Sequence, residues 1–184
     1  MKTLALIGLF VAATFGVNAQ DVKFPGIDSS PADFSYFPVN AAKAKDSSGP
    51  LIRVLYSRPA KKGREIFGIL EQFGKVWRVG ANESTEIKFY KPVVINNKRV
   101  KAGAYSLFII PDKNSWVFIL NKQTDRWGAF AYDEAKDIIR TEVPINTLPK
   151  PLETLSIIFK PIHRGAALVI AWDKTSAELP IIIK

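Results

Sequence analysis

The sequence predicts an all-β protein, an antiparallel β-sandwich or partly open barrel of about eight or nine strands with one short helix. Three observations predict this fold class. Short segments rich in β-branched and aromatic residues follow one another over residues 51–183. Turn signals separate these segments at intervals of roughly 8 to 12 residues, the spacing typical of a sandwich or barrel. Helical patterns do not alternate with the strands, so a parallel sheet with crossover helices is not expected.

The N-terminus has the pattern of a secretory signal peptide over residues 1–19. A positive Lys2 precedes the apolar run 4–17, and small residues ending at Ala19 place the cleavage site before Gln20. A membrane anchor is the alternative, but a spanning helix needs roughly 20 apolar residues, more than this run provides. We therefore expect a periplasmic or secreted protein with no transmembrane segment in the mature chain.

Residues 20–50 are expected to form an irregular N-terminal segment docked on the domain, and residues 51–184 to form the β-domain itself. The segment carries four prolines between Ser, Asp and Gly residues. Its rings, at Phe34, Tyr36 and Phe37, are too apolar for a free tail, so we expect them to pack against the domain.

The elements of the domain follow from alternation and turn chemistry. The expected strands are 51–56, 84–90, 93–95, 98–100, 103–110, 115–120, 138–143, 154–160, 166–172 and 179–183. Asn96-Asn97 predicts a two-residue hairpin turn, because Asn tolerates positive φ. The near-helical spacing of apolar residues over 66–73, followed by Gly74, predicts the short helix. Residues 133–137 are expected to form one helical turn.

The composition limits the classes of function. The 184-residue chain has no cysteine, which excludes disulfides, thiol catalysis and thiolate metal sites. Its formal net charge is +9, and removal of Lys2 with the signal peptide leaves +8. A basic chain suggests acidic partners, yet export argues against nucleic acid. An anionic small molecule or a glycan is the expected partner, unless the charge is only spread over a solvated surface. The sequence does not indicate the oligomeric state.

A dense block of residues in the middle of the chain supports a family resemblance. Its motifs are Tyr56-Ser57-Arg58-Pro59, Lys62-Gly63-Arg64, Gly74-Lys75-Val76-Trp77-Arg78 and Gly80-Ala81-Asn82-Glu83-Ser84-Thr85, followed downstream by Trp127-Gly128-Ala129. This block resembles the DUF2911 family, exported bacterial proteins of unknown function that are common in Bacteroidetes. The resemblance covers roughly Ser30 to the C-terminus. It implies the localisation and the domain extent, and no reaction.

No motif identifies a known chemistry. His163 is the only histidine, so we expect no metal site and no cofactor. There is no nucleophile elbow for a serine hydrolase. Glu83 and Glu86 could form a catalytic pair, but on one strand their odd spacing sends them to opposite faces. A pairing with Asp125 or Glu153 stays open. No catalytic residue is assigned, and the sequence leans against an enzyme without deciding the question.

Seven residues are the candidate ligand-binding set: Arg58, Arg64, Trp77, Arg78, Asn82, Glu83 and Trp127. Two polar, Gly-rich segments flank the expected short helix, so the polar members of the set before Trp127 should converge at one end of the sandwich. Arginine binds carboxylate or phosphate through a planar fork, and tryptophan offers a flat face to a sugar ring.

A structural interpretation of the same residues stays open. Glu65, Glu71 or Glu86 would then complete a closed ion-pair network, and Arg78 would hold a buried Glu83. Trp77 would belong to the core, and Trp127 would close one end of the sandwich.

The sequence thus favours a non-catalytic periplasmic or secreted module that binds an anionic or glycan ligand or associates with the envelope. A hydrolase acting on envelope glycans is the first alternative. The second is a structural accessory protein that binds another protein through its exposed sheet.

Overall fold

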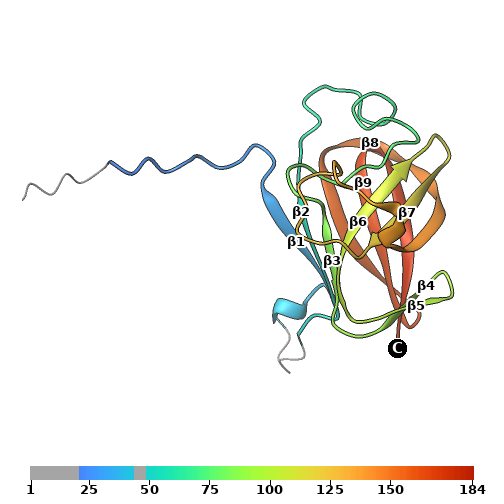
Figure 1. Cartoon of the computed structure of the whole chain (residues 1–184). Helices are drawn as coiled ribbons and strands as arrows, with labels where there is room; N and C mark the ends of the chain where they lie inside the picture. The colour runs from blue at the N-terminus through green and yellow to red at the C-terminus, as the bar shows by residue number, and fades with distance from the viewer. Residues whose placement is uncertain (1–20, 44–48) are drawn as a thin grey trace, which may run out of the picture.

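The structure, a computed structural model, describes residues 21–43 and 49–184. The regular secondary structure of this part of the chain is almost entirely strand (Figure 1). The strands are β1 (Ala32–Phe37), β2 (Ile52–Ser57), β3 (Glu86–Phe89), β4 (Val93–Ile95), β5 (Lys98–Val100), β6 (Gly103–Pro111), β7 (Ser115–Asn121), β8 (Asp137–Ile162) and β9 (Gly165–Ile183). Two single turns of 3-10 helix, η1 (Ala41–Lys43) and η2 (Glu134–Lys136), are the helical elements among the described residues.

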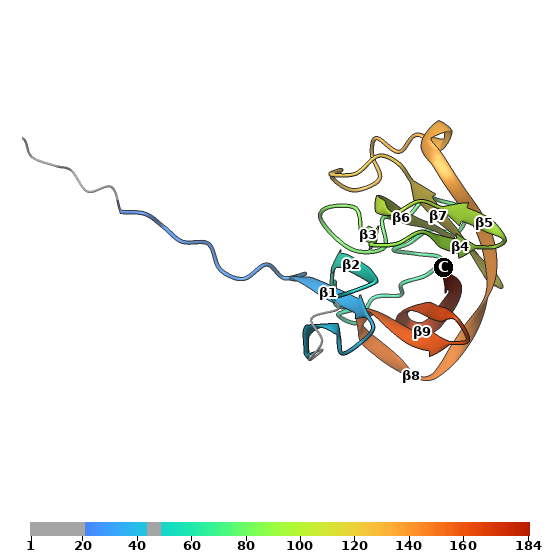
Figure 2. The ribbon, with the colours of Figure 1, turned by 90° about the horizontal axis from the view of Figure 1, so that it is seen from below.

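All nine strands belong to one antiparallel sheet in the order β1-β2-β3-β6-β7-β8-β9-β4-β5. The 26-residue strand β8 takes part in two halves of this sheet, because residues 137–144 pair with β7 and residues 145–162 pair with β9. Within the second part, the register of β8 against β9 shifts on both sides of Leu152. In Figure 2, β8 sweeps around one side of the molecule from β7 to β9. The all-β antiparallel fold that the sequence predicts, a sandwich or partly open barrel, is confirmed.

The chain that continues from β2 closes this barrel at one end. Ala60 forms an isolated bridge with Thr154 of β8, and the Lys61 N–H donates to the Glu153 carbonyl at 2.7 Å. The Leu155 N–H donates to the carbonyl of Pro59 at 3.1 Å. Proline has no N–H to donate to a ladder, but its carbonyl still accepts a hydrogen bond here. As a result, the loop that follows β2 is held against β8 and β9.

Three tryptophans form the centre of the core. Trp77, Trp116 and Trp172 are at most 3% exposed. Trp77 stacks on Trp172 with ring centroids 6.2 Å apart and meets Trp116 edge to face at 6.1 Å. The burial of β2 alternates along the strand, with Ile52 and Val54 fully enclosed, as expected of a strand with one face on the core.

The expectation of an irregular segment over 20–50 is wrong for residues 32–37. These residues form β1, which pairs with β2 along its whole length. Residues 32–37 contain a short alternation of polar and aromatic residues, but the prolines on both sides of it indicate a loop. The expected docking of rings holds for Phe37, which packs against Phe159 with ring centroids 6.1 Å apart, whereas Phe34 is 47% exposed.

The helix expected over 66–73 is also wrong, because these residues form turns. The Glu71 N–H donates to the Ile66 carbonyl and the Gly68 N–H donates to the Glu71 carbonyl, both at 2.9 Å. Gly68 has a φ of +97°, outside the helical region. A two-turn helix has little stability of its own. Burial of Ile66, and of Phe67 against Trp116, therefore determines the conformation.

Two local predictions are confirmed. Asn96 and Asn97 connect β4 to β5 with φ of +46° and +62°, the left-handed pair of a type I′ turn. The helical turn expected near 133–137 is η2, and the Asp133 side chain caps it by accepting from the Ala135 N–H at 2.9 Å.

The signal peptide expected over residues 1–19 lies outside the described residues. Within residues 21–43 and 49–184, no helix has the length and apolar character needed to cross a membrane.

Candidate functional site

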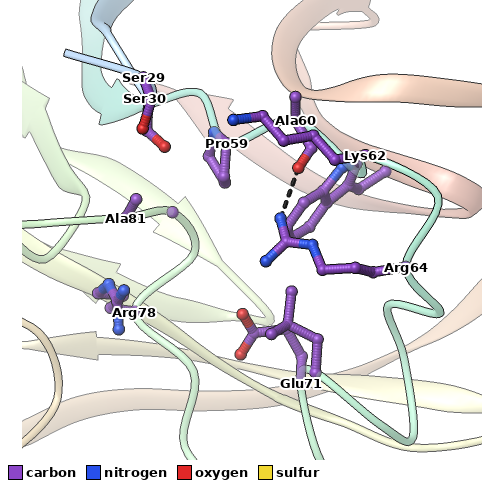
Figure 3. A pocket seen from close by; sticks show the side chains of 12 residues that line it. Ser29, Ser30, Pro59, Ala60, Lys62, Arg64, Glu71, Arg78 and Ala81 are labelled. Carbon is purple, nitrogen blue, oxygen red and sulfur yellow. Dashed lines mark hydrogen bonds between the residues drawn. The ribbon is translucent and has the colours of Figure 1, made fainter.

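A cavity of about 260 Å³ lies where the loop after β2 meets β9. Three cationic side chains line it, together with one carboxylate: Lys62, Arg64, Arg78 and Glu71. Ser29 and Ser30 add two hydroxyl groups, and Trp172 forms part of the wall. Figure 3 shows the guanidinium group of Arg64 and the carboxylate of Glu71 turned toward the same space, with Arg78 on its other side.

A tight turn presents Lys62 and Arg64. The Arg64 N–H donates to the Lys61 carbonyl at 3.0 Å, and Lys62 and Gly63 have φ of +49° and +72°. These angles are those of a type I′ turn, and glycine at its second position adopts them without steric cost. The Arg64 side chain bends back onto the turn, since Nε donates to the Lys61 carbonyl at 2.9 Å and one terminal nitrogen donates to the Ala60 carbonyl at 2.6 Å. The guanidinium group is therefore held at the cavity before any ligand arrives.

Arg78 follows a residue that is fixed in the core. Trp77 exchanges two backbone hydrogen bonds with Ile109 of β6, at 2.8 and 3.0 Å. Val79 on the other side of Arg78 is fully buried with a φ of +60°, an uncommon conformation for a β-branched residue. The Thr85 hydroxyl donates to the Val79 carbonyl at 2.8 Å and stabilises this conformation. Backbone strain of this kind concentrates at functional sites.

The side chain of Arg78 keeps a hydrogen-bond donor that has no partner in the described part of the chain. Its Nε atom is buried and has no hydrogen-bond partner within the described part of the chain. No ion pair within 4 Å joins Arg78 to a carboxylate of those residues either. Buried polar atoms are normally paired, so this donor is an orphan at the edge of the cavity.

Burial raises the pKa of the Glu71 carboxyl to about 7, although the charges of Arg78 and Arg64 act in the opposite direction. Glu71 makes no ion pair with either arginine among the described residues. The carboxyl group therefore changes its charge near neutral pH inside a cavity that is otherwise cationic. The sequence signal for such a half-buried acid is its place between the apolar residues Leu70 and Phe73.

The predicted set of binding residues is only partly brought together. Arg64 and Arg78 share the cavity, but Arg58 lies outside it. Arg58 pairs with Asp33 of β1 at 2.8 Å and donates from Nε to the Leu155 carbonyl of β8 at 3.2 Å. It therefore joins three strands. Trp77 is 3% exposed and belongs to the core, so its ring face is not available to a sugar.

Asn82, Glu83 and Trp127 form a separate group. The Gly128 N–H donates to the Asn82 carbonyl at 3.0 Å, and Glu83 forms an isolated bridge with Trp127. Trp127 is 63% exposed, as a binding platform would be. Glu83 is exposed and lines a second cavity of about 230 Å³, so Arg78 does not hold a buried Glu83.

The comparisons with known proteins identify the family. The model of a family described as "Protein of unknown function (DUF2911)" matches residues 38–181. This range includes Lys62, Arg64, Glu71 and Arg78 and every strand except β1, apart from the last residues of β9. No curated protein and no solved structure matches the chain. Since the match spans well over half of the sequence, the chain belongs to the DUF2911 family.

Proposed function

We propose that this protein is a non-catalytic binding module, periplasmic or secreted, that holds a small anionic ligand or the acidic group of a glycan in the cavity between the β2 loop and β9. One observation carries the proposal. Three cations face one carboxylate around a cavity, and no ion pair joins that carboxylate to either arginine among the described residues.

The chemistry of the lining suits an anion. Arg64 and Arg78 offer planar forks for carboxylate, sulfate or phosphate oxygens, and Lys62 adds a point charge. The orphan Nε of Arg78 gains a partner when an anion binds. Like charges gathered in one cavity also repel each other, and an anion relieves this repulsion.

The size of the cavity limits the size of the ligand. Its volume of about 260 Å³ lies below the roughly 300–1,000 Å³ of sites that enclose a drug-sized molecule. One acidic sugar ring, or one anionic group at the end of a larger molecule, fits this space better than an oligosaccharide does.

A hydrolase is the second candidate, supported by the meeting of Glu83, Glu86 and Asp125 at the second cavity. Glu86 is already ion-paired with Arg53 at 2.6 Å, which leaves it less free to transfer a proton. Incubation with envelope glycans separates the two candidates, because a hydrolase releases fragments and a binding module does not.

A thermal-shift comparison tests the binding site. The probes are sulfate and glucuronate, with neutral glucose as the reference ligand. We expect the anions to raise the melting temperature of the wild type by mass action, as a ligand at 100 times its Kd adds about 2.7 kcal/mol of stability. Arg78→Ala should lose this rise while keeping the stability of the free protein, because no ion pair is broken.

The matched control is Arg99→Ala, which removes an exposed cation from the β4–β5 hairpin. It should respond to the anions as the wild type does. Equal responses of Arg78→Ala and the wild type, or a loss of several kcal/mol in the free Arg78→Ala protein, would contradict the proposal.

Export is tested by the mature N-terminus. Mass spectrometry of the protein recovered from a host that secretes it should give a chain that begins at Gln20. A chain that still begins with Met1 would refute export by a cleaved signal peptide.

A further inference from the structure

We infer that the cavity binds its anion together with one proton, which Glu71 holds and donates to the ligand as a hydrogen bond. The inference rests on the proposed function, since it names the ligand chemistry and the regulation of that same cavity. It makes Glu71 a binding residue that distinguishes ligands by their acceptor atoms.

The position of Glu71 is fixed. Its backbone N–H and carbonyl hydrogen bond to Ile66 and Gly68, both at 2.9 Å, and Ile66 is fully buried in the core. The carboxyl group cannot leave the cavity by a movement of the loop without breaking these contacts. Figure 3 shows it directed into the space that an anion bound to Arg64 and Arg78 would occupy.

The charged groups around Glu71 come from two segments. Lys62 and Arg64 belong to the turn after β2, and Arg78 precedes β3. The remaining polar groups of the cavity are the neutral hydroxyls of Ser29 and Ser30, which precede β1, while β9 contributes the ring of Trp172. Glu71 is therefore the one group of the described cavity lining whose charge opposes an anion.

Protonation removes this opposition and adds a donor. An ionised carboxylate only accepts hydrogen bonds, so its oxygens would face the oxygens of the ligand with like charge. A protonated carboxyl has an O–H that can donate to the same oxygens. Because burial already places the pKa of Glu71 at about 7, the proton is taken up at little cost under neutral conditions.

The ligand class follows from this donor. The bound group must present an acceptor oxygen beside its charge, as a carboxylate, a sulfate or a sugar acid does. Simple halide ions lack this arrangement of oxygens and gain only the Coulomb attraction of the cations.

The pH dependence of affinity has a defined direction. Below pH 7 Glu71 is protonated before the ligand arrives, so the affinity changes little. Above pH 7 only the protonated fraction of the protein is competent to bind, and the apparent affinity falls in proportion to that fraction. Between pH 6 and pH 8 the expected loss is about tenfold.

Isothermal titration calorimetry with sodium glucuronate tests the inference. The titrations are done at pH 6, 7 and 8, each in two buffers that differ in their enthalpy of ionisation. The carboxyl of glucuronate is fully ionised over this range, so any proton taken up is bound by the protein. We expect the wild type to take up about half a proton at pH 7 and nearly one at pH 8, with affinity about tenfold lower at pH 8 than at pH 6.

Glu71→Gln and Glu65→Gln are the informative variants, and circular dichroism checks that both fold. Glu71→Gln should bind glucuronate with the same affinity at all three values of pH and without proton uptake. Glu65→Gln, which removes an exposed carboxylate from the same loop, should behave as the wild type does.

The outcomes separate the two proposals. Binding that depends on Arg78 but shows no proton uptake in the wild type overturns the inference and leaves the anion site in place. Equal proton uptake in the wild type and Glu71→Gln also overturns it, because another group then holds the proton. If glucuronate and sulfate bind at none of the three pH values, the proposed function fails and the inference fails with it.

Discussion

Replacement of Glu71 by glutamine should change how the stability of the free protein depends on pH. Glu71 has a pKa of about 7 in the folded chain, against an ordinary value of 4.5, because burial disfavours its charged form. Between these two values the unfolded chain loses the proton while the folded chain keeps it. The contribution of Glu71 to stability is therefore highest at low pH and falls as the pH rises from about 4.5 through 7.

The magnitude follows from the same two values. The folded pKa lies about 2.5 above the ordinary one, and each unit is worth about 1.4 kcal/mol, so ionisation of Glu71 costs about 3 kcal/mol above pH 7. Glutamine keeps the shape of the side chain and carries no charge. The variant should match the wild type near pH 4.5 and become more stable than it by up to about 3 kcal/mol at pH 8.

Urea denaturation at pH 4.5, 6, 7 and 8 measures this difference. The free energies of unfolding of wild type and Glu71→Gln should separate as the pH rises, while Glu65→Gln should remain parallel to the wild type. Parallel curves for the wild type and Glu71→Gln would contradict a raised pKa of Glu71, as would a variant that is less stable than the wild type at pH 8.

Substitutions at three further positions test other parts of the structure. Asn97→Gly should leave the melting temperature unchanged or slightly raised and Asn97→Val should lower it, because Asn97 has a φ of +62°; equal melting temperatures would contradict the turn. Trp77→Ala should reduce the free energy of unfolding by roughly 3–5 kcal/mol in urea denaturation, as expected for a ring removed from the core; a loss below 1 kcal/mol would show that Trp77 is not packed there. Arg58→Ala should lower the free energy of unfolding by about 1–2 kcal/mol, because the partly exposed ion pair contributes little and the hydrogen bonds to β8 contribute most of the effect. The variant should keep the thermal shifts that anions induce in the wild type.

Most strands could be predicted from local patterns. In a strand with one buried face, apolar and polar residues alternate whichever strands it pairs with. The long strand β8 could not be predicted in this way, because Pro144 and Pro149 indicate breaks where the chain bends and continues. Pro144 still pairs with Ser115 at the end of the β7 ladder, where the missing N–H is tolerated. What the sequence divides into separate strands is therefore continuous in space.

The site was predictable in part for a similar reason. Arg64 and Arg78 lie near each other in the sequence. The loop between them folds back, so that both side chains line one cavity. Arg58 is equally near in sequence, but its partners on β8 lie about a hundred positions further along the chain. Local reasoning cannot find such a partner. The sequence places Glu71 in a structural network at most, because its burial depends on how the loop folds against the core.

The bridge between residues 59–61 and 153–155 has a consequence for how the molecule unfolds. It ties the first half of the barrel to the second, and β8 runs through both, so neither half can open while the other stays intact. Native-state hydrogen exchange should then show the amides of Lys61 and Leu155 opening only with the whole domain. Contacts this distant in sequence also slow folding, because a long loop must close before they form. The cavity beside that bridge is expected to be among the last features to form and to be lost with the first global opening.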